Sequence, residues 1–159
     1  MARKIDTDTF GFLATDISRL IRADLDRRIG KTGIGLTAGE GRTLIHAARA
    51  GSVRQNVLAE RMGVEAMTLS SFLDRLEGRG LVTRRPDPAD RRAKLIEITE
   101  AADAVISDIQ SMSASIRQGA ARGIDPAEWE RFLSVLKAVR NNLAELRGEP
   151  QRQSPGSIS

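Results

Sequence analysis

The segment from Leu81 to Thr99 constrains the fold more than any other part of the sequence. Two runs that alternate apolar and charged residues, 81–85 and 94–98, flank the cluster Pro-Asp-Pro-Ala-Asp at 86–90. Alternation with a period of two is typical of β-strands, and clustered Pro and Asp residues mark a turn. The segment therefore predicts a β-hairpin with a charged tip, and the hairpin directly follows a predicted helix.

The rest of the sequence is dominated by helical periodicity. Apolar residues recur at spacings of three and four, which is typical of amphipathic helices. Thr37 and Glu40 predict a capping box, and Asp125 followed by Pro126 predicts the start of another helix. We expect a mainly α fold with a small β-hairpin wing and helices over residues 9–30, 37–50, 53–62, 65–79, 99–122 and 125–146.

Residues 53–79 have the pattern of a helix-turn-helix. Ala59 supplies the small side chain that two steeply crossing helices need at their contact, and Gly63 allows the positive φ of a sharp turn. Leu69 is expected to fill the core beneath the second helix. Two packed helices occur in many α-proteins, so the arginine-rich hairpin that follows is what favours DNA binding over that simpler interpretation.

The positive charge of the chain is concentrated in one short window. The net charge is +4 and the pI is about 10.3, which alone is a weak bias toward polyanions. Residues 75–94, however, hold seven Lys/Arg against three Asp/Glu. A helix that enters a groove, beside a basic hairpin that holds the backbone or the minor groove, is a physically suitable DNA-binding unit.

The expected DNA contacts lie on the outward face of helix 65–79 and on the hairpin. Short hydroxyl side chains can approach base edges, and arginine can hold guanine or phosphate. We expect Asp90 to orient Arg92 by a charge-assisted hydrogen bond toward the minor groove, where the potential is most negative. The full set of expected DNA-binding residues is Met67, Thr68, Ser70, Ser71, Arg75, Arg84, Arg85, Asp90, Arg91, Arg92 and Lys94.

The composition excludes several classes of function. There is no cysteine, so disulfides, thiol switches and thiolate metal sites are excluded, and a single histidine, His46, disfavours a histidine metal site. No nucleophile–base pair or phosphate-binding loop is present, so we expect neither enzymatic activity nor a cofactor. No apolar run approaches the ~18 residues of a membrane span, and the N-terminus lacks the apolar stretch of a signal peptide. We expect a cytoplasmic protein without membrane contact.

Residues 73–82 and 87–94 resemble the MarR family of winged-helix regulators, named for multiple antibiotic resistance. The wing motif of that family corresponds here to Asp90, Arg92, Ile98 and Thr99. The resemblance covers about residues 9–147 and implies a single domain over 1–147 that forms an obligate homodimer. Within it, residues 36–99 would form the DNA-binding lobe, 9–30 and 100–147 would form the dimerisation helices, and residues 148–159 would form a flexible tail.

Two positions depart from what the resemblance implies. Many relatives carry Arg where this chain has Ser71, which affects sequence preference, and a bulky aromatic where it has Gly41, which would leave more space beneath helix 37–50. Relatives bind small aromatic or anionic effectors in a cleft between the dimer helices and the DNA-binding lobe. By that resemblance we expect Ile17, Ile21 and His46 to line such a cleft, although a lone histidine is more often a surface or hydrogen-bonded residue.

The leading hypothesis is a ligand-responsive, dimeric transcription regulator that binds a pseudo-palindromic operator in double-stranded DNA, and we expect it to act as a repressor. The main alternative is a non-sensing DNA-binding or architectural protein on the same fold. Ligand-induced changes in DNA affinity would separate the two. An enzyme would need a pocket with strongly perturbed carboxylates.

Overall fold

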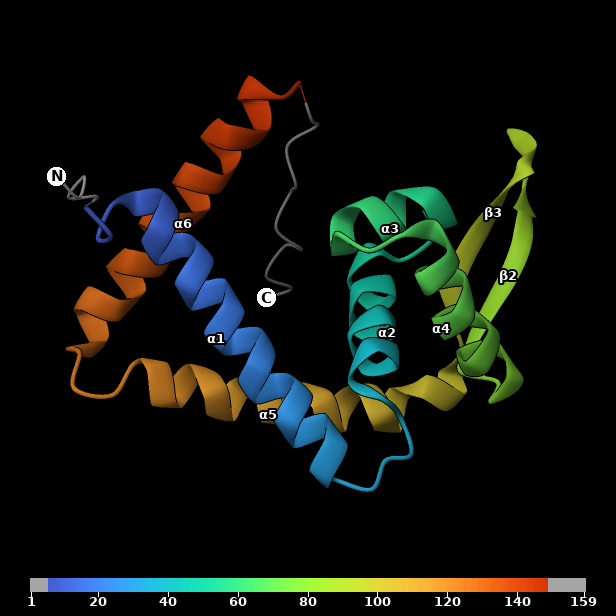
Figure 1. Cartoon of the computed structure of the whole chain (residues 1–159), viewed down its shortest axis with the longest axis horizontal. Helices are drawn as coiled ribbons and strands as arrows, with labels where there is room; N and C mark the ends of the chain where they lie inside the picture. Colours follow the sequence, from blue (N-terminus) through green and yellow to red (C-terminus); the bar gives the residue numbers. More distant parts are fainter. Residues whose placement is uncertain (1–5, 149–159) are drawn as a thin grey trace, which may run out of the picture. The chain divides into compact units, whose positions relative to one another are not determined.

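The computed structural model describes residues 6–148, so the predicted tail at 148–159 lies outside the described residues apart from Gly148. The chain forms two compact units, one ending at Ile116 and the other beginning at Arg117. The first unit holds α1 (Phe10–Lys31), α2 (Ala38–Ala50), α3 (Gln55–Met62), α4 (Ala66–Gly78), strands β1 (Val53–Arg54), β2 (Val82–Asp87) and β3 (Asp90–Ile98), a 3-10 turn (Glu100–Ala102) and most of α5 (Asp103–Ala120). The chain is therefore mainly helical with a small sheet, as predicted (Figure 1).

The helix boundaries follow from local signals in the sequence. The backbone N–H of Glu40 donates to the Thr37 hydroxyl and the backbone N–H of Thr37 donates to the Glu40 carboxylate, which completes the predicted capping box of α2. Gly51 ends α2 with a φ of +74°. Gly63 has a left-handed φ of +63° between α3 and α4, a conformation that its missing Cβ makes inexpensive.

The sheet is larger than the predicted hairpin. Its strand order is β1-β3-β2, all antiparallel, and Val53 and Arg54 pair with Ile96 and Leu95. The prediction of one helix over residues 53–62 was therefore wrong at its start, because Val53 and Arg54 form β1 and the helix begins at Gln55. The predicted turn at 86–90 was also too long, since only residues 88–89 separate the strands.

The core of the first unit is built from the inward faces of α2, α3 and α4 together with the sheet. Ala59 and Leu69, the residues expected at the helix-turn-helix contact, are buried, and Leu69 is 0% exposed. The other buried apolar residues of this core are Leu36, Leu44, Ala47, Val53, Leu58, Met62, Leu73, Leu76, Leu81, Val82, Ile96, Ala102 and Ile106. This core fixes the orientation of α4, so its outward face is presented on a rigid support.

Two glycines of α2 mark close packing rather than empty space. A Cβ on Gly41 would lie 2.8 Å from the Cδ1 of Ile29 and 3.5 Å from that of Ile109. The prediction that Gly41 leaves extra space beneath α2 is therefore wrong, because these isoleucine side chains fill that space. A Cβ on Gly39 would lie 2.3 Å from the ring of Phe72, so α2 and α4 approach closely at that point.

The second unit contains α6 (Pro126–Leu146). The Asp125 carboxylate accepts hydrogen bonds from the backbone N–H groups of Ala127 and Glu128, and Pro126 occupies the first turn, as predicted. None of its described residues is classed as buried in the single chain. The rings of Trp129 and Phe132 lie 5.4 Å apart, and the exposed apolar residues of α6 are Phe132, Val135, Leu136, Leu143 and Leu146.

Candidate nucleic-acid interface

The outward face of α4 presents small polar and apolar side chains. Leu69, Leu73 and Leu76 face the core, so Met67, Thr68 and Asp74 are exposed, as the predicted inward stripe requires. Ser70 and Ser71 are half-buried. The residues that were expected to contact DNA thus lie on the outward side of α4, and their side chains are small or apolar.

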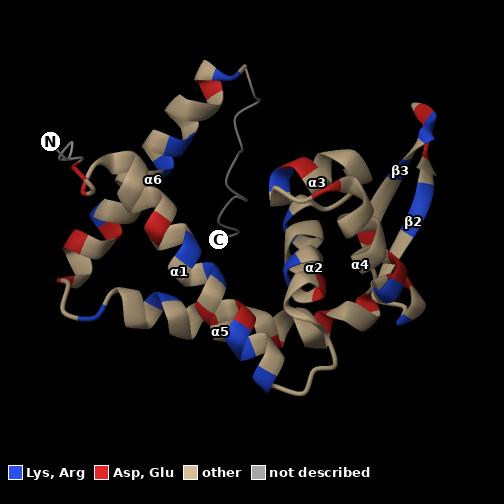
Figure 2. Ribbon diagram, in the orientation of Figure 1, with Lys and Arg blue, Asp and Glu red and all other residues tan. Residues whose placement is uncertain are grey.

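The wing carries exposed positive charge at its tip. The β2–β3 hairpin projects from the first unit, and its Lys and Arg residues lie along the strands and at the tip, where acidic residues also lie (Figures 1 and 2). Arg91, Arg92 and Lys94 are all exposed on β3, and the side chain of Arg92 is 95% exposed. No ion pair within residues 6–148 involves Arg91 or Lys94.

The expected contact between Asp90 and Arg92 is present. Oδ1 of Asp90 accepts from the backbone N–H of Arg92 at 3.1 Å and from its Nε at 3.4 Å. The backbone bond closes a local turn, and the longer side-chain bond leaves most of the guanidinium open to solvent. This arrangement orients Arg92 at the tip without consuming its other donors.

Arg84 is held by two carboxylates of α4. Its Nη2 lies 2.5 Å from Oδ1 of Asp74 and 2.6 Å from Oε2 of Glu77, and its side chain is only 21% exposed. The hydrogen bond to Glu77 raises the pKa of Arg84, and the same bond lowers the pKa of Glu77. Arg84 and Glu77 are therefore charged at neutral pH, and Arg84 joins β2 to α4. The sequence did not indicate these partners.

Arg85 and Arg75 are also paired. Nη2 of Arg85 lies 2.6 Å from Oε1 of Glu97 on β3, which lowers the pKa of Glu97. Nη1 of Arg75 lies 2.9 Å from Oε1 of the buried Glu40, and its Nη2 donates to the Ser71 hydroxyl at 3.2 Å. These expected DNA-binding arginines therefore already have partners within the chain.

Two further arginines support the interface, and neither was among the expected residues. Nε of Arg54 lies 2.6 Å from Oδ2 of Asp87, so β1 is tied to the base of the hairpin turn. The pKa of Asp87 is lowered mainly by the hydrogen bond from the backbone N–H of Ala89, and the hydrogen bond from Arg54 lowers it further. The Asp87 carboxylate therefore stays charged at neutral pH. Arg79 donates to the carbonyls of Gly35 and Ile34 and thereby ties the end of α4 to the connection before α2.

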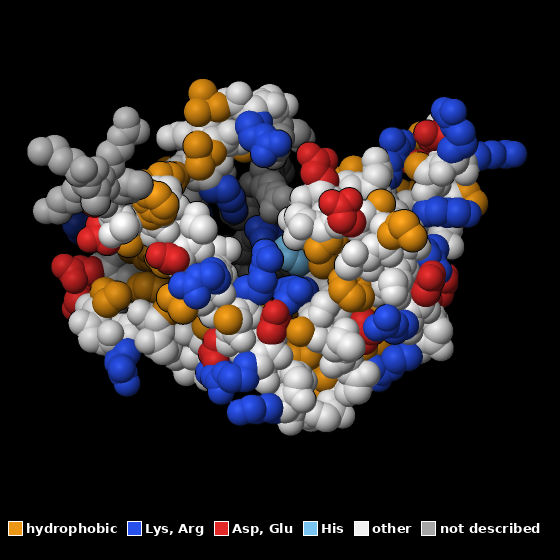
Figure 3. All heavy atoms as spheres, in the orientation of Figure 1, with side chains coloured by type: hydrophobic (Ala, Val, Ile, Leu, Met, Phe, Trp, Pro, Cys, Tyr) orange, Lys and Arg blue, Asp and Glu red, His pale blue; other side chains and the backbone are white. Residues whose placement is uncertain are grey.

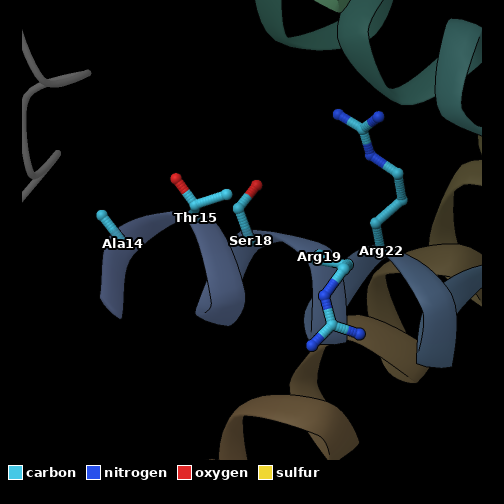
Figure 4. Close-up of a pocket in the computed structure, with 5 residues that line it drawn as sticks. All are labelled: Ala14, Thr15, Ser18, Arg19 and Arg22. Carbon is cyan, nitrogen blue, oxygen red and sulfur yellow. The ribbon is translucent and has the colours of Figure 1, made fainter. Parts of the chain in front are cut away.

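The expected effector residues lie on two helices. Ile17 and Ile21 are about half exposed on α1, and His46 is half-buried on α2. An open hollow of about 490 Å³ lies along α1, but its lining residues are Ala14, Thr15, Ser18, Arg19 and Arg22. Thr15, Ser18 and Arg22 project to the same side of the helix (Figure 4). The structure thus places a hollow that contains two arginines beside the expected apolar residues, not around them.

Other kinds of site find no support in the part of the chain that the structure describes. Among residues 6–148, no group of His, Asp and Glu side chains is arranged to hold a metal ion. No described helix is long and apolar enough to cross a membrane.

Comparisons with known proteins agree with the geometry of this winged-helix unit. Residues 36–94 match the model of the MarR family. The transcriptional regulator PA3341, whose crystal structure is known, is similar to this chain. The two sequences are 40% identical, the TM-score of the two structures is 0.69, and the match covers 86% of this chain and 99% of that chain. A transcriptional regulator (MarR family) from Rhodococcus sp. RHA1 is 26% identical, with a TM-score of 0.69 and coverage of 87% and 96%.

CouR from Rhodococcus jostii RHA1, in a crystal structure bound to p-coumaroyl-CoA, is 28% identical, with a TM-score of 0.63 and coverage of 84% and 92%. The helix-turn-helix, the hairpin wing and these similarities together identify the fold as a winged helix. The chain belongs to the MarR family of transcriptional regulators, whose members bind DNA and act as dimers.

Proposed function

We propose that this protein is a ligand-responsive, dimeric repressor that binds a pseudo-palindromic operator. The observation that carries the proposal is the wing tip, where Arg91, Arg92 and Lys94 are exposed beside a helix-turn-helix. The space-filling view has blue side chains around the end of the hairpin (Figure 3). A regulator of this kind acts on the chromosome, so we place it in the cytoplasm.

The contacts divide into base-facing and backbone-facing residues. Met67, Thr68, Ser70 and Ser71 lie on the first two turns of α4, the part of a recognition helix that contacts base edges. Arg92, oriented by Asp90, enters the minor groove, while Arg91 and Lys94 contact phosphates. Arg75, Arg84 and Arg85 border the same surface, and their ion pairs support a positioning role alongside any phosphate contact.

Exposed apolar side chains support dimerisation. On α1, Phe10, Leu13, Ile17, Leu20 and Ile21 are 45–57% exposed, and α6 exposes a second apolar set. Large apolar surfaces of this kind are unfavourable in water and favour burial against a second copy. We therefore assign residues 9–30 and 100–147 as dimerisation helices. Residues 36–99, which contain the helix-turn-helix and the wing, form the DNA-binding lobe.

Two copies related by a two-fold axis present two α4 helices, so the operator has inverted half-sites about one helical turn apart. Selection of bound fragments from random DNA is expected to return such repeats. Three unpaired or loosely held cations per wing, one in the minor groove and two at phosphates, displace about six counterions per dimer, so affinity is expected to fall by about three orders of magnitude between 50 and 200 mM salt. Fluorescence anisotropy at several salt concentrations measures this slope.

A protein that remains monomeric at micromolar concentration, or whose DNA affinity does not change with salt, would contradict the proposal. The double variant Arg91→Gln/Lys94→Gln serves as an internal control, because it should make the salt dependence shallower while the dimer persists. Analytical ultracentrifugation of both proteins separates loss of the dimer from loss of phosphate contacts.

Control by a small organic molecule is the second element of the proposal. CouR was crystallised with p-coumaroyl-CoA, and this supports an aromatic or anionic effector here. We assign Ile17, Ile21 and His46 to the effector site. A ligand changes DNA affinity only if it binds one spacing of the two lobes better than the other, and such coupling is usually about 5–150-fold.

Titration of the DNA-bound protein with a panel of aromatic carboxylates and their CoA thioesters tests this control. At least one compound is expected to release the DNA, and His46→Ala, which lies outside the apolar surface assigned to dimerisation, is expected to weaken that release without changing basal DNA affinity. Peroxide and zinc serve as negative controls, because the chain has no cysteine. If no organic compound acts, the non-sensing or architectural alternative replaces this part of the proposal.

A further inference from the structure

We infer that the protein recognises thymine in its operator through the 5-methyl group, by apolar contact with Met67, and that arginine–guanine contacts from α4 do not contribute. This inference rests on the proposed DNA-binding function and specifies which base chemistry the same surface selects. It is carried by the exposure of Met67 together with the ion pairs that surround it.

Met67 combines unusual exposure with a base-facing position. Its side chain is 86% exposed, the largest fraction among the exposed large apolar residues of the described chain. A single exposed methionine is not informative by itself, because isolated apolar residues are common on protein surfaces. Met67, however, lies in the first turn of α4, where a recognition helix contacts base edges. In the major groove, the only methyl group that a base presents is that of thymine.

The neighbours of Met67 do not offer a charged donor to guanine. Guanine presents two acceptors in the major groove, N7 and O6, and Arg or Lys is its usual partner. On this face of α4, Arg75 is already bound to Glu40 and Ser71. Arg84, the wing arginine that contacts α4, is bound to Asp74 and Glu77.

The charge that remains beside the start of α4 is an acceptor. Glu65 directly precedes the first turn, is exposed and has no ion-pair partner within residues 6–148, whereas the carboxylate of Asp74 is bound to Arg84. A carboxylate repels the N7 and O6 acceptors of guanine, and it accepts hydrogen bonds from the amino group of adenine or of cytosine alike. Thr68 adds a second methyl group and a hydroxyl. The apolar contact is thus what selects thymine, and the carboxylate disfavours a guanine edge without distinguishing adenine from cytosine.

The wing supplies an independent preference in the same direction. Arg92 is 95% exposed at the tip of the hairpin, and an exposed arginine is favoured in the narrow minor groove of A·T-rich DNA. The wing responds to groove width, whereas Met67 responds to the methyl group itself. Replacing thymine by deoxyuridine removes the methyl group and keeps the base pairing, so it isolates the contribution of Met67.

The experiment starts from the tightest duplex that the full-length protein selects from random DNA. Each thymine of one half-site is replaced singly by deoxyuridine, and each guanine singly by 7-deazaguanine, which lacks the N7 acceptor. At one or more positions, deoxyuridine is expected to weaken binding about fourfold, and about 15-fold when both half-sites are changed, which is the usual effect of losing one buried methyl group per site. The 7-deazaguanine duplexes are expected to bind as the parent duplex does.

Two variants of Met67 complete the test, and its exposure makes both safe for the fold. Met67→Leu keeps an apolar side chain and is expected to retain the deoxyuridine effect, whereas Met67→Gln is expected to lose it. The inference is overturned if deoxyuridine has no effect at any position, if Met67→Gln retains the full effect, or if 7-deazaguanine weakens binding fourfold or more. Failure to select any salt-sensitive duplex would instead overturn the proposed function itself.

Discussion

The variant Arg92→Ala is expected to bind operator DNA about 100-fold more weakly than the parent protein, or worse. The guanidinium is 95% exposed, so its loss removes no packing within the chain. A hydrogen bond to a charged group contributes about 1.5–3 kcal/mol, and the two-fold axis of a dimer makes the substitution count twice. Anisotropy titrations measure the affinity, and the melting temperature should change little.

The variant Asp90→Ala tests whether the orientation of Arg92 matters. Removing a negative charge close to DNA should strengthen binding if net charge alone decides the affinity. We expect weaker binding, because Oδ1 of Asp90 accepts both the backbone N–H and the Nε of Arg92. Tighter binding of Asp90→Ala would show that this orientation is unimportant. Asp8→Ala is a control that removes an equal negative charge from an exposed position outside both the winged-helix lobe and the dimerisation helices.

The variant Leu69→Ala is expected to lower the free energy of unfolding by about 2–5 kcal/mol, the usual cost of truncating a fully buried leucine. Leu69 is 0% exposed between the helices of the helix-turn-helix, where the cavity cannot be filled by solvent-exposed neighbours. Because small proteins are stable by only about 5–15 kcal/mol, this loss should also reduce the fraction of DNA-competent protein.

Met67→Ala is the matched control for Leu69→Ala. Both residues are large and apolar on α4, but Met67 is 86% exposed. Its truncation should change stability by less than about 0.5 kcal/mol, since surface substitutions usually do. Urea unfolding followed by circular dichroism measures both variants. Equal losses from the two would contradict the inward orientation of Leu69.

Local features of the sequence predicted most of the architecture. The capping box at Thr37, the left-handed turn at Gly63 and the cap at Asp125 each depend on residues within a few positions of one another. β1 was missed because two residues are too few to display alternation, and pairing with β3 is what makes them a strand. Secondary structure of that kind is fixed by a tertiary contact and has no local signal.

The candidate site could be located from the sequence but its ion pairs could not. The charge window at 75–94 indicated the surface, and the Asp90–Arg92 contact was predicted because only two positions separate the residues. Nothing in the sequence indicated that Arg84 and Arg75 are paired with carboxylates. Their partners, Glu77 and Glu40, become neighbours only after the helices and strands have packed. The actual contacts of these residues with DNA stay predictions.

The attachment of Arg84 to Asp74 and Glu77 has a consequence for the kinetics of DNA binding. Because these bonds join β2 to α4, the wing and the helix are already aligned when the protein meets a duplex. The entropy of fixing one relative to the other is then lost during folding and not during association. The helix and the wing can then bind the major and minor grooves in one step. Dissociation has to break both contacts together, which lengthens the residence time on the operator.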